Sequence, residues 1–133
     1  MPHRTRCPVA CALDLIGDRW SLLIIRDLMF YGRHEYKDLL AAGENISSNT
    51  LSQRLARLTR AGLITSGPHP DSKRRKLYDL TLRGKQLAPS MVALIAWADQ
   101  HLAPDIPKAQ RVLLRQNPQA VIDHALHRKT PLA

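Results

Sequence analysis

Cysteine is scarce in this sequence. The 133 residues include two cysteines, Cys7 and Cys11, too few for a disulfide framework and consistent with a reducing cytoplasm. The Cys-x-x-x-Cys spacing is not that of a zinc-binding pair, and no second pair follows. His124 and His127 lie three residues apart on one expected helix face, but no third ligand accompanies them. The sequence therefore predicts neither a metal site nor a cofactor.

Long apolar runs are also missing. The most apolar stretch, WSLLIIRDLMFY, is interrupted by Arg26 and Asp27 and is too short to cross a bilayer. No segment has the pattern of a signal peptide. We therefore expect a cytoplasmic protein without a membrane partner.

The signatures of common enzyme classes are absent as well. We find no Gly-rich phosphate loop and no nucleophile elbow, and no histidine or acid is placed to activate Cys7 as a nucleophile. The alternative is a thiol-dependent enzyme that uses Cys7. A turnover assay distinguishes it from a sensor, because an enzyme consumes its substrate repeatedly whereas a sensor is modified once. The sequence predicts that the protein is not an enzyme.

Acidic residues are few relative to basic ones. The 11 Asp and Glu residues face 20 Lys and Arg residues, so the formal net charge is +9. Such a charge suits a polyanionic partner, either nucleic acid or an anionic membrane surface. The densest basic cluster falls in an expected turn rather than on an amphipathic helix, which disfavours the membrane surface. Nucleic acid is therefore the expected partner.

Helical periodicity dominates the first half of the chain. Pro8 is well placed to begin a first helix, and Asp18 can cap a second helix that is apolar almost all round and therefore central. Residues 34–42 predict a short third helix, after which Ser47 can cap a fourth. Gly62 ends that fourth helix.

The second half adds a hairpin and further helices. LITSG and KLYDLT predict two short strands around the turn PHPDSKRR. Thr81 can cap a long helix over residues 82–102, in which Pro89 predicts a kink or a later start. Two more helices are expected over residues 108–116 and 118–129. The predicted fold is mainly α with a small β-hairpin wing, a winged helix-turn-helix, with a DNA-binding domain at 7–102 and a helical extension at 103–133.

The fourth helix carries the candidate base-reading face. At 100° per residue, Leu51, Leu55 and Leu58 fall on one side, and a polar set falls on the other. Asn and Gln side chains can pair with adenine and Arg with guanine in the major groove. The expected recognition residues are Ser47, Ser48, Asn49, Ser52, Gln53, Arg57 and Arg60. An ordinary solvated helix face is the alternative.

The hairpin carries the candidate phosphate-binding residues. Lys73, Arg74, Arg75 and Lys76 are consecutive and would hold backbone phosphates, with at most one entering the minor groove. A non-specific architectural DNA binder is an alternative, but a polar rather than purely cationic recognition face disfavours it. We also expect His34 and His69 to contact phosphate or solvent.

Several segments resemble the HxlR-type transcriptional regulators, which are related to the MarR winged-helix group. They are CPVACALDLIGDRWSLLIIRDL, EYKDLL, ISSNTLSQRLARLTRAGLI and YDLTLRGKQLAPSMVALIAWAD. The resemblance implies a homodimer that binds operator DNA in a bacterium or archaeon. A two-fold dimer reads two half-sites, so its operator is expected to be palindromic. The chain departs from the family pattern Gly-Pro-Arg-Arg-Phe at residues 32–36, and its wing is more basic than the common Pro-Pro-Arg form. The operator sequence therefore does not follow from the resemblance.

The expected long helix over residues 82–102 carries an apolar stripe that is larger than a small core needs to cover. We therefore predict that this stripe forms a dimer interface. Its residues are Leu87, Met91, Leu94, Trp97, Ala98 and Leu102. The N-terminal helix and the tail helices are expected to complete this interface. The alternative is that the stripe simply covers the chain's own core.

Cys7 is the candidate sensor of an oxidant or of another small-molecule effector. It directly precedes a helix start, and the helix dipole with the nearby Arg4 and Arg6 favours a thiolate. The resemblance implies the same role, because some members of the family sense oxidants, quinones or aldehydes through a cysteine at this position. A purely structural thiol remains the alternative for Cys7, whereas Cys11 is expected in the core.

Overall fold

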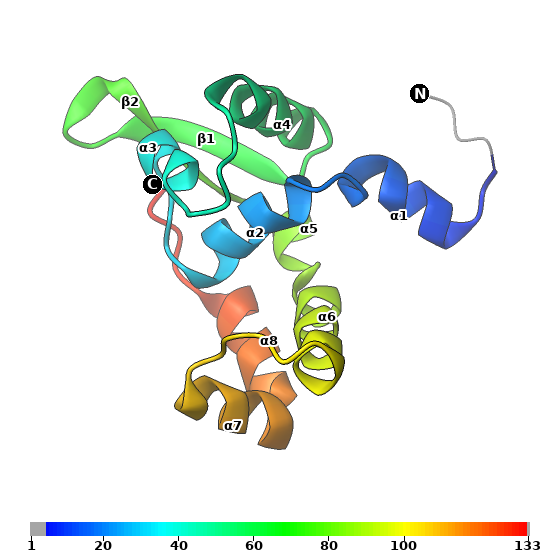
Figure 1. Ribbon diagram of the computed structural model, residues 1–133. Coiled ribbons are helices and arrows are strands. Elements are labelled where there is room, and N and C mark those ends of the chain that lie inside the picture. The colour runs from blue at the N-terminus through cyan, green and yellow to red at the C-terminus, as the bar shows by residue number, and fades with distance from the viewer. Residues whose placement is uncertain (1–4, 133) are drawn as a thin grey trace.

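The computed structural model describes residues 5–132 and confirms the mainly helical architecture with a two-stranded hairpin. The elements in chain order are α1 (Pro8–Ile16), α2 (Ser21–Phe30), α3 (Tyr36–Leu40), α4 (Ser48–Arg60), β1 (Ile64–His69), β2 (Ser72–Leu80), α5 (Leu82–Lys85), α6 (Ala88–His101), α7 (Lys108–Gln116) and α8 (Pro118–His127). Figure 1 shows α2, α3, α4 and the hairpin as one body, with α6, α7 and α8 gathered beside it. No described helix has the length and apolar character needed to cross a membrane.

Local capping chemistry sets where the helices begin, as the sequence predicted. The Ser47 hydroxyl accepts a hydrogen bond from the Thr50 amide at 3.1 Å, and the Thr81 hydroxyl accepts one from the Gly84 amide at 3.1 Å. The Asn117 side chain accepts one from the Ala120 amide at 3.2 Å. Each cap satisfies an amide that would otherwise lack a partner in the first helical turn.

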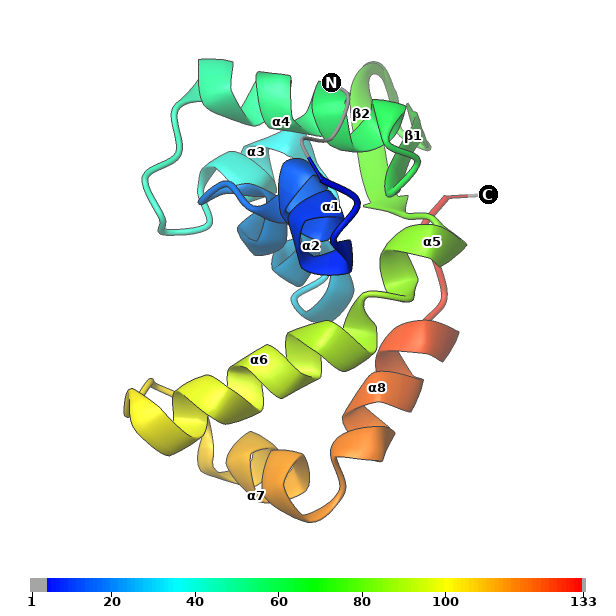
Figure 2. The same ribbon diagram turned by 90° about the vertical axis from the view of Figure 1, so that its right-hand side faces the viewer.

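The long helix predicted after the hairpin is interrupted where Pro89 requires it. The short helix α5 ends at Lys85, and α6 begins at Ala88 with a proline in its first turn. Proline is tolerated there because the first amides of a helix have no partner within the helix. The two helices can therefore point in different directions, as Figure 2 shows.

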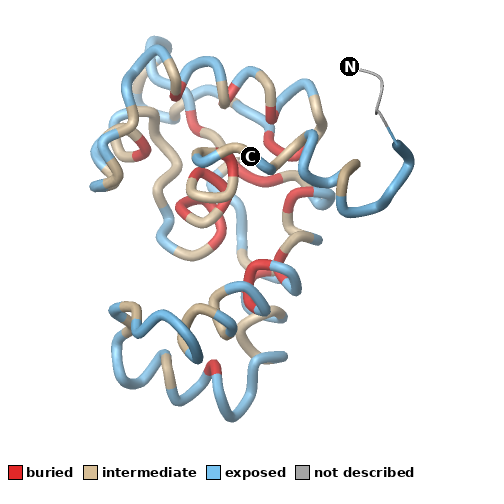
Figure 3. Tube along the Cα trace, turned by 45° about the vertical axis from the view of Figure 1, so that its right-hand side comes forward, coloured by how far each residue is buried: buried red, intermediate tan, exposed pale blue. Residues whose placement is uncertain are grey.

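The core lies where α2 and α4 meet the hairpin. Ile25, Leu28, Leu51 and Leu58 are completely buried, and Met91 of α6 and Ala125 of α8 belong to the same cluster. The predicted inner face of the recognition helix is thus confirmed. Figure 3 shows buried residues concentrated in this region, whereas none of α1 is fully buried.

The wing is a β-hairpin with a third, very short partner. β1 and β2 pair antiparallel, with Ile64 opposite Leu80 and Gly67 opposite Leu77. On the other edge of β2, Glu35 forms an isolated bridge with Leu77, and the Tyr78 amide donates to the His34 carbonyl at 2.7 Å. The segment that leads into α3 is therefore fixed to the wing by backbone hydrogen bonds.

Candidate nucleic-acid interface

The outer face of α4 presents polar side chains in the predicted arrangement. Ser47, Ser48, Asn49, Ser52, Gln53 and Arg60 are all exposed. The opposite face of the helix is held in the core by Leu51, Leu55 and Leu58. Burial of one helix face orients the polar face outward, and Figure 1 shows α4 following α3 after the loop of residues 41–47.

Arg57 differs from the other predicted recognition residues. It is only partly exposed, and its guanidinium donates to the backbone carbonyl of Asp14 in α1. Sequence periodicity placed Arg57 at the flank of the polar face, and it could not show that α1 lies within reach. In this structure Arg57 links α1 to α4 rather than facing outward.

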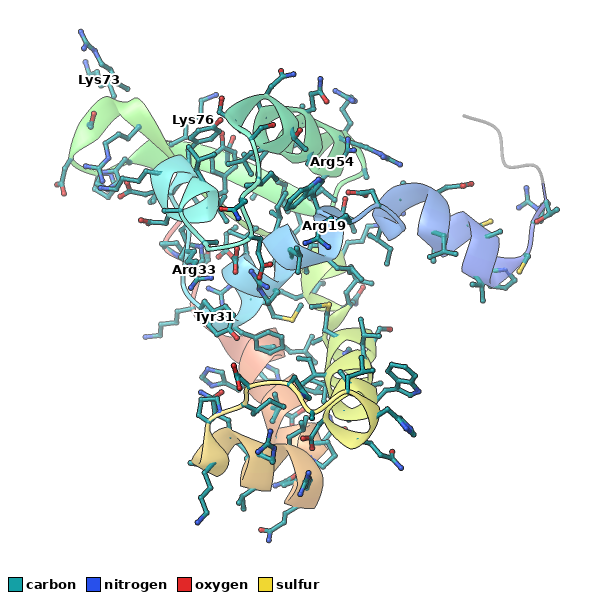
Figure 4. The ribbon with its side chains drawn as sticks, viewed as in Figure 1. Arg19, Tyr31, Arg33, Arg54, Lys73 and Lys76 are labelled. Carbon is teal, nitrogen blue, oxygen red and sulfur yellow. The ribbon has the colours of Figure 1, made fainter. Side chains whose placement is uncertain are left out.

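A second arginine ties α4 to the start of α2. The Nε atom of Arg54, labelled in Figure 4, lies 3.0 Å from a carboxylate oxygen of Asp18. That carboxylate also accepts hydrogen bonds from the Trp20 and Ser21 amides, both at 3.0 Å. Burial raises the pKa of Asp18, but these hydrogen bonds and Arg54 outweigh it and hold the pKa below its usual value. Asp18, the predicted cap, thus binds the amides at the start of α2, although the N-cap position itself is Trp20, and it also positions α4.

The basic cluster Lys73, Arg74, Arg75 and Lys76 lies within strand β2, not in a turn, so that part of the prediction is wrong. The strand runs from Ser72 to Leu80, and all four cations are exposed. Because successive strand residues point to opposite sides, Arg74 and Lys76 share one side and Lys73 and Arg75 the other. Figure 4 shows Lys73 near the tip of the wing and Lys76 between the wing and α4.

A hollow of about 650 Å³ opens between the wing and α3. It is lined by Glu35, Tyr36, Lys37, Arg74, Arg75, Lys76 and Tyr78. The Tyr36 hydroxyl donates to the Ser48 carbonyl at 2.9 Å and lies 3.2 Å from the Ser52 hydroxyl. The hollow therefore adjoins the N-terminal end of α4.

Sequence reasoning missed Tyr36, Lys37 and Tyr78 as candidate site residues. The sequence places Tyr36 in the expected third helix and Tyr78 in the expected second strand, and it indicates a role at the site for neither. Extending the strand pattern two residues at a time from Tyr78 back to Lys76 and Arg74 would have placed these three on one side. The contribution of α3 to the hollow had no local signal, because it depends on packing between distant segments.

Glu35 compensates part of the positive charge of the wing. Its carboxylate accepts from the Arg75 guanidinium, with one Nε to Oε2 distance of 3.2 Å, and lies 3.0 Å from His69 Nε2 and 3.7 Å from Lys37 Nζ. The hydrogen bond from Arg75 lowers the pKa of Glu35 below its usual value. Arg75 is thus engaged within the protein, unlike the other three cations of the cluster.

The two histidines expected to meet phosphate or solvent are instead held inside the protein, so that expectation is wrong. His34 Nδ1 lies 2.9 Å from the Tyr78 carbonyl oxygen, and His69 lies beside Glu35. Only 13% of the His34 side chain and 12% of the His69 side chain are exposed. Both serve to join the wing to the segment before α3.

The residues predicted for a dimer interface divide into two groups. Met91 is buried in the chain's own core, and Leu87 packs against that core. Leu94, Trp97 and Leu102 are exposed to 51%, 54% and 63%, and Ala98 is partly exposed. The alternative that the stripe covers the core thus describes its first part only.

Helix α1 also exposes an apolar face. Val9 and Leu13 are exposed to 66% and 56%. Figure 1 shows α1 extending away from the body of the molecule. Such exposure of large apolar side chains at two sites indicates a surface that a partner could cover.

Cys7 is exposed and immediately precedes α1, as the sequence predicted. Arg4, one of the two cations expected near it, lies outside the described residues. Cys11 is only partly buried and does not belong to the core cluster, so its expected core position is wrong. Within residues 5–132 no group of three or more His, Cys, Asp or Glu side chains is arranged to hold a metal ion.

Two helices joined by a loop, of which the second exposes a polar face and is followed by a basic hairpin, define the winged helix-turn-helix class of proteins. Residues 15–106 match the family model of the HxlR-like helix-turn-helix. The chain therefore belongs to the HxlR-like helix-turn-helix family, whose members are transcriptional regulators and not enzymes.

Individual relatives agree with this assignment. The chain is 35% identical over 88 residues to an uncharacterised HTH-type transcriptional regulator of Synechocystis, with 66% of this chain and 64% of that protein covered. The match thus spans just under two thirds of that relative's length. It is 33% identical over 101 residues to the regulator YodB of Bacillus subtilis, with 75% of this chain and 89% of YodB covered.

Solved structures show the same fold. The candidate transcription factor PA1607 superposes with a TM-score of 0.68 at 35% identity, with 78% of this chain and 72% of that chain covered. Reduced YodB superposes with a TM-score of 0.60 at 32% identity, with 77% of this chain and 100% of that chain covered. YodB has also been solved in a quinone-bound form.

Proposed function

We propose that this protein is a sequence-specific DNA-binding transcriptional regulator that binds a palindromic operator as a homodimer. The observation that carries the proposal is the juxtaposition of the polar α4 face with a cationic hollow beside the wing. The protein's membership in a family of transcriptional regulators also supports the proposal. Operator DNA lies in the cytoplasm, at the nucleoid of a bacterial or archaeal cell, so the protein would act there.

The exposed α4 residues would read bases in the major groove. Asn49 and Gln53 have the length and the hydrogen-bonding groups for adenine, and Arg60 has those for guanine or phosphate. Ser47, Ser48 and Ser52 lie at the N-terminal end, which normally contacts base edges. Arg57 would take part only after leaving the Asp14 carbonyl.

The hollow would hold the phosphodiester backbone that runs between the recognition helix and the wing. Lys37, Arg74 and Lys76 line it with positive charge. Phosphate contacts of this kind position a protein on DNA, whereas base contacts specify the site. Lys73, near the wing tip, would meet the flanking backbone or minor groove.

A homodimer would place two recognition helices on successive turns of DNA, about 34 Å apart. The exposed Leu94 and Trp97 of α6 and Leu102 directly after it support such an interface. The exposed Val9 and Leu13 of α1 would extend it. Leu87 and Met91 would support this surface from within the protomer rather than contact the partner.

Cys7 would be the switch through which an oxidant or electrophile alters DNA binding. It is exposed at a helix start, and its relative YodB exists in a quinone-bound form. A quinone would add covalently to the thiolate and alter α1, which contacts α4 through Arg57. Replacing Cys7 by Ser should abolish the effect of quinone on DNA binding, whereas replacing Cys11 by Ser should leave it; an unchanged response in C7S would rule the switch out.

Equilibrium DNA binding tests the main proposal. The reduced protein is titrated with duplexes from the intergenic regions beside its own gene and with mixed-sequence duplex, across a salt series. We expect a preference of about 10³ or more for one intergenic duplex, and a salt slope of about −0.9 for each phosphate contacted. Equal, salt-sensitive binding to every duplex would instead indicate an architectural DNA binder.

Two substitutions separate the roles of the helix and the hollow. Gln53→Ala should weaken binding to the specific duplex by about 1–3 kcal/mol and leave mixed-sequence binding unchanged. Lys76→Ala should weaken binding to both duplexes and make the salt slope shallower by about 0.9. Gln100→Ala on α6 and Lys108→Ala on α7 are matched controls, because both residues are exposed and lie away from this face.

A further inference from the structure

The last described residues of the chain form a strap that returns to the wing. We define this C-terminal strap as residues 128–132, which follow α8. Figure 1 shows the C-terminal segment leaving α8 and passing toward α3 and the hairpin. The family model ends at residue 106, so the strap belongs to the extension beyond the matched region.

A buried ion pair anchors the strap on β2. Arg128 Nη2 lies 2.7 Å from Asp79 Oδ1, and the Asp79 side chain is completely buried. Asp79 also accepts a hydrogen bond from the Leu80 amide at 2.8 Å. Burial raises the pKa of Asp79, but the hydrogen bonds from Arg128, Thr130 and the Leu80 amide, together with the charge of Arg128, outweigh it and hold the pKa below its usual value. Without Arg128, the buried carboxylate would lose its arginine and keep only hydrogen bonds from Thr130 and the Leu80 amide, with His34 Nδ1 at 3.7 Å, and burying a carboxylate without its charge partner is costly.

The strap also contacts the strand opposite and the segment before α3. The position where a Cβ of Gly67 would stand lies 3.0 Å from Leu132 Cδ2, so Leu132 packs directly on β1. Arg128 Nη1 lies 3.5 Å from His34 Nε2, and His34 precedes α3. One short segment therefore touches both strands of the wing and the entry to the helix-turn-helix.

We propose that the C-terminal strap fixes the wing relative to the recognition helix and that Arg128 is a positioning residue for DNA binding. The DNA part of this inference rests on the function proposed above. Asp79 lies in the same strand as Arg74 and Lys76, so anchoring Asp79 determines where these cations stand along the hollow. The contact with His34 sets the same strand against α3, which leads into α4.

Hydrogen exchange and DNA binding test the strap together. In Arg128→Met, the amides of β2 should exchange faster than in the native chain, while those at the centre of α4 should keep their protection. Binding to a mixed-sequence duplex should weaken, and its salt slope should become shallower by about 0.9 for each phosphate that the wing no longer binds. Arg128→Lys should restore part of both properties.

Lys129→Met is the matched control, because it removes the same charge from the exposed neighbouring residue. Equal wing exchange and equal salt slopes in R128M and K129M would overturn the proposal. If R128M fails to fold, D79N/R128M is compared with D79N, because the double variant leaves no unpaired carboxylate at residue 79. Faster wing exchange in the double variant would support the strap, and equal exchange would overturn it. Failure of the native chain to bind any DNA would count against the proposed function, whereas the exchange comparison would still decide whether the strap holds the wing.

Discussion

At Glu35, one carboxylate sets how much free positive charge the wing presents. Arg75 is one of four consecutive cations on β2, yet its guanidinium is bound to Glu35. We expect Glu35→Gln to weaken this ion pair and release Arg75 toward DNA. Affinity for a mixed-sequence duplex should rise, and the salt slope should steepen by up to about 0.9, the contribution of one phosphate. Titration over a salt series measures both.

Asp71→Asn is the control for this prediction. It changes the net charge by the same amount at an exposed position in the hairpin turn. It should raise affinity less than E35Q, because distant exposed charges are screened by salt. If E35Q and D71N raise DNA affinity equally, the Glu35–Arg75 pair has no specific effect.

Asp18 should make the fold sensitive to acid. Its pKa in the folded chain lies below its ordinary value, about 3.9 in unfolded chains. A depressed pKa means that the stabilisation is fully present above about pH 4 and is lost as the pH falls through the folded-state pKa. Asp18→Ala should therefore lower the free energy of unfolding by about 1–2 kcal/mol at pH 7, and by progressively less below pH 4. Urea unfolding across this pH range measures the difference.

Asp105→Ala, at an exposed position, is the control for this prediction. A loss of stability in D18A that stays constant with pH would contradict the prediction.

At the scale of single elements, the cap of the recognition helix should be measurable in isolation. The Ser47 hydroxyl accepts from the Thr50 amide, so Ser47→Ala should lower the free energy of unfolding by about 1 kcal/mol. Ser90→Ala on α6, an exposed serine outside any cap, should change it by less than about 0.5 kcal/mol. Urea unfolding of both variants is the test, and equal effects would show that the cap is not what stabilises α4.

The elements that sequence reasoning predicted well are those whose signals are local. Ser47, Thr81 and Asn117 cap helices through amides three residues away, and Pro89 interrupts a helix through its own ring. The extent of β2 was predicted less well. Its first half is a run of cations without the apolar alternation of a half-buried strand, and it is a strand because β1 and Glu35 pair with it.

For the candidate site too, the features with local signals were predicted and those that depend on distant contacts were not. Exposure of Asn49, Gln53 and Arg60 follows from helical periodicity and was predicted. The bonds of Arg57 to α1 and of Arg75 to Glu35 join residues about forty positions apart, and no local pattern encodes them. The C-terminal strap depends on a contact between residues still farther apart in the sequence, because Arg128 and Asp79 meet only after α5 to α8 have folded back.

At the scale of the whole molecule, a single chain leaves large apolar side chains on α1 and α6 exposed to water. α1 extends from the body with Val9 and Leu13 exposed, α6 exposes Leu94 and Trp97, and Leu102 is exposed directly after α6. Water contact with so many large apolar side chains is unfavourable, by about 25 cal/mol for each Å² that a partner could have covered. A second copy of the chain would cover both surfaces and would provide the two-fold symmetry that a palindromic operator has.

Trp97→Glu should therefore convert the proposed dimer into monomers, because a carboxylate at the interface would be buried without a partner. The matched control is Tyr31→Glu. Tyr31 is exposed to 56%, close to the 54% of Trp97, and Figure 4 shows it on the side away from α1. Sedimentation equilibrium should give a dimer for the native chain and for Y31E, and a monomer for W97E. The monomer should bind a duplex with two half-sites no more tightly than a duplex with one, because two unlinked chains no longer bind both half-sites as one unit. A dimeric W97E would place the interface elsewhere, and α1 would then be the surface to substitute next.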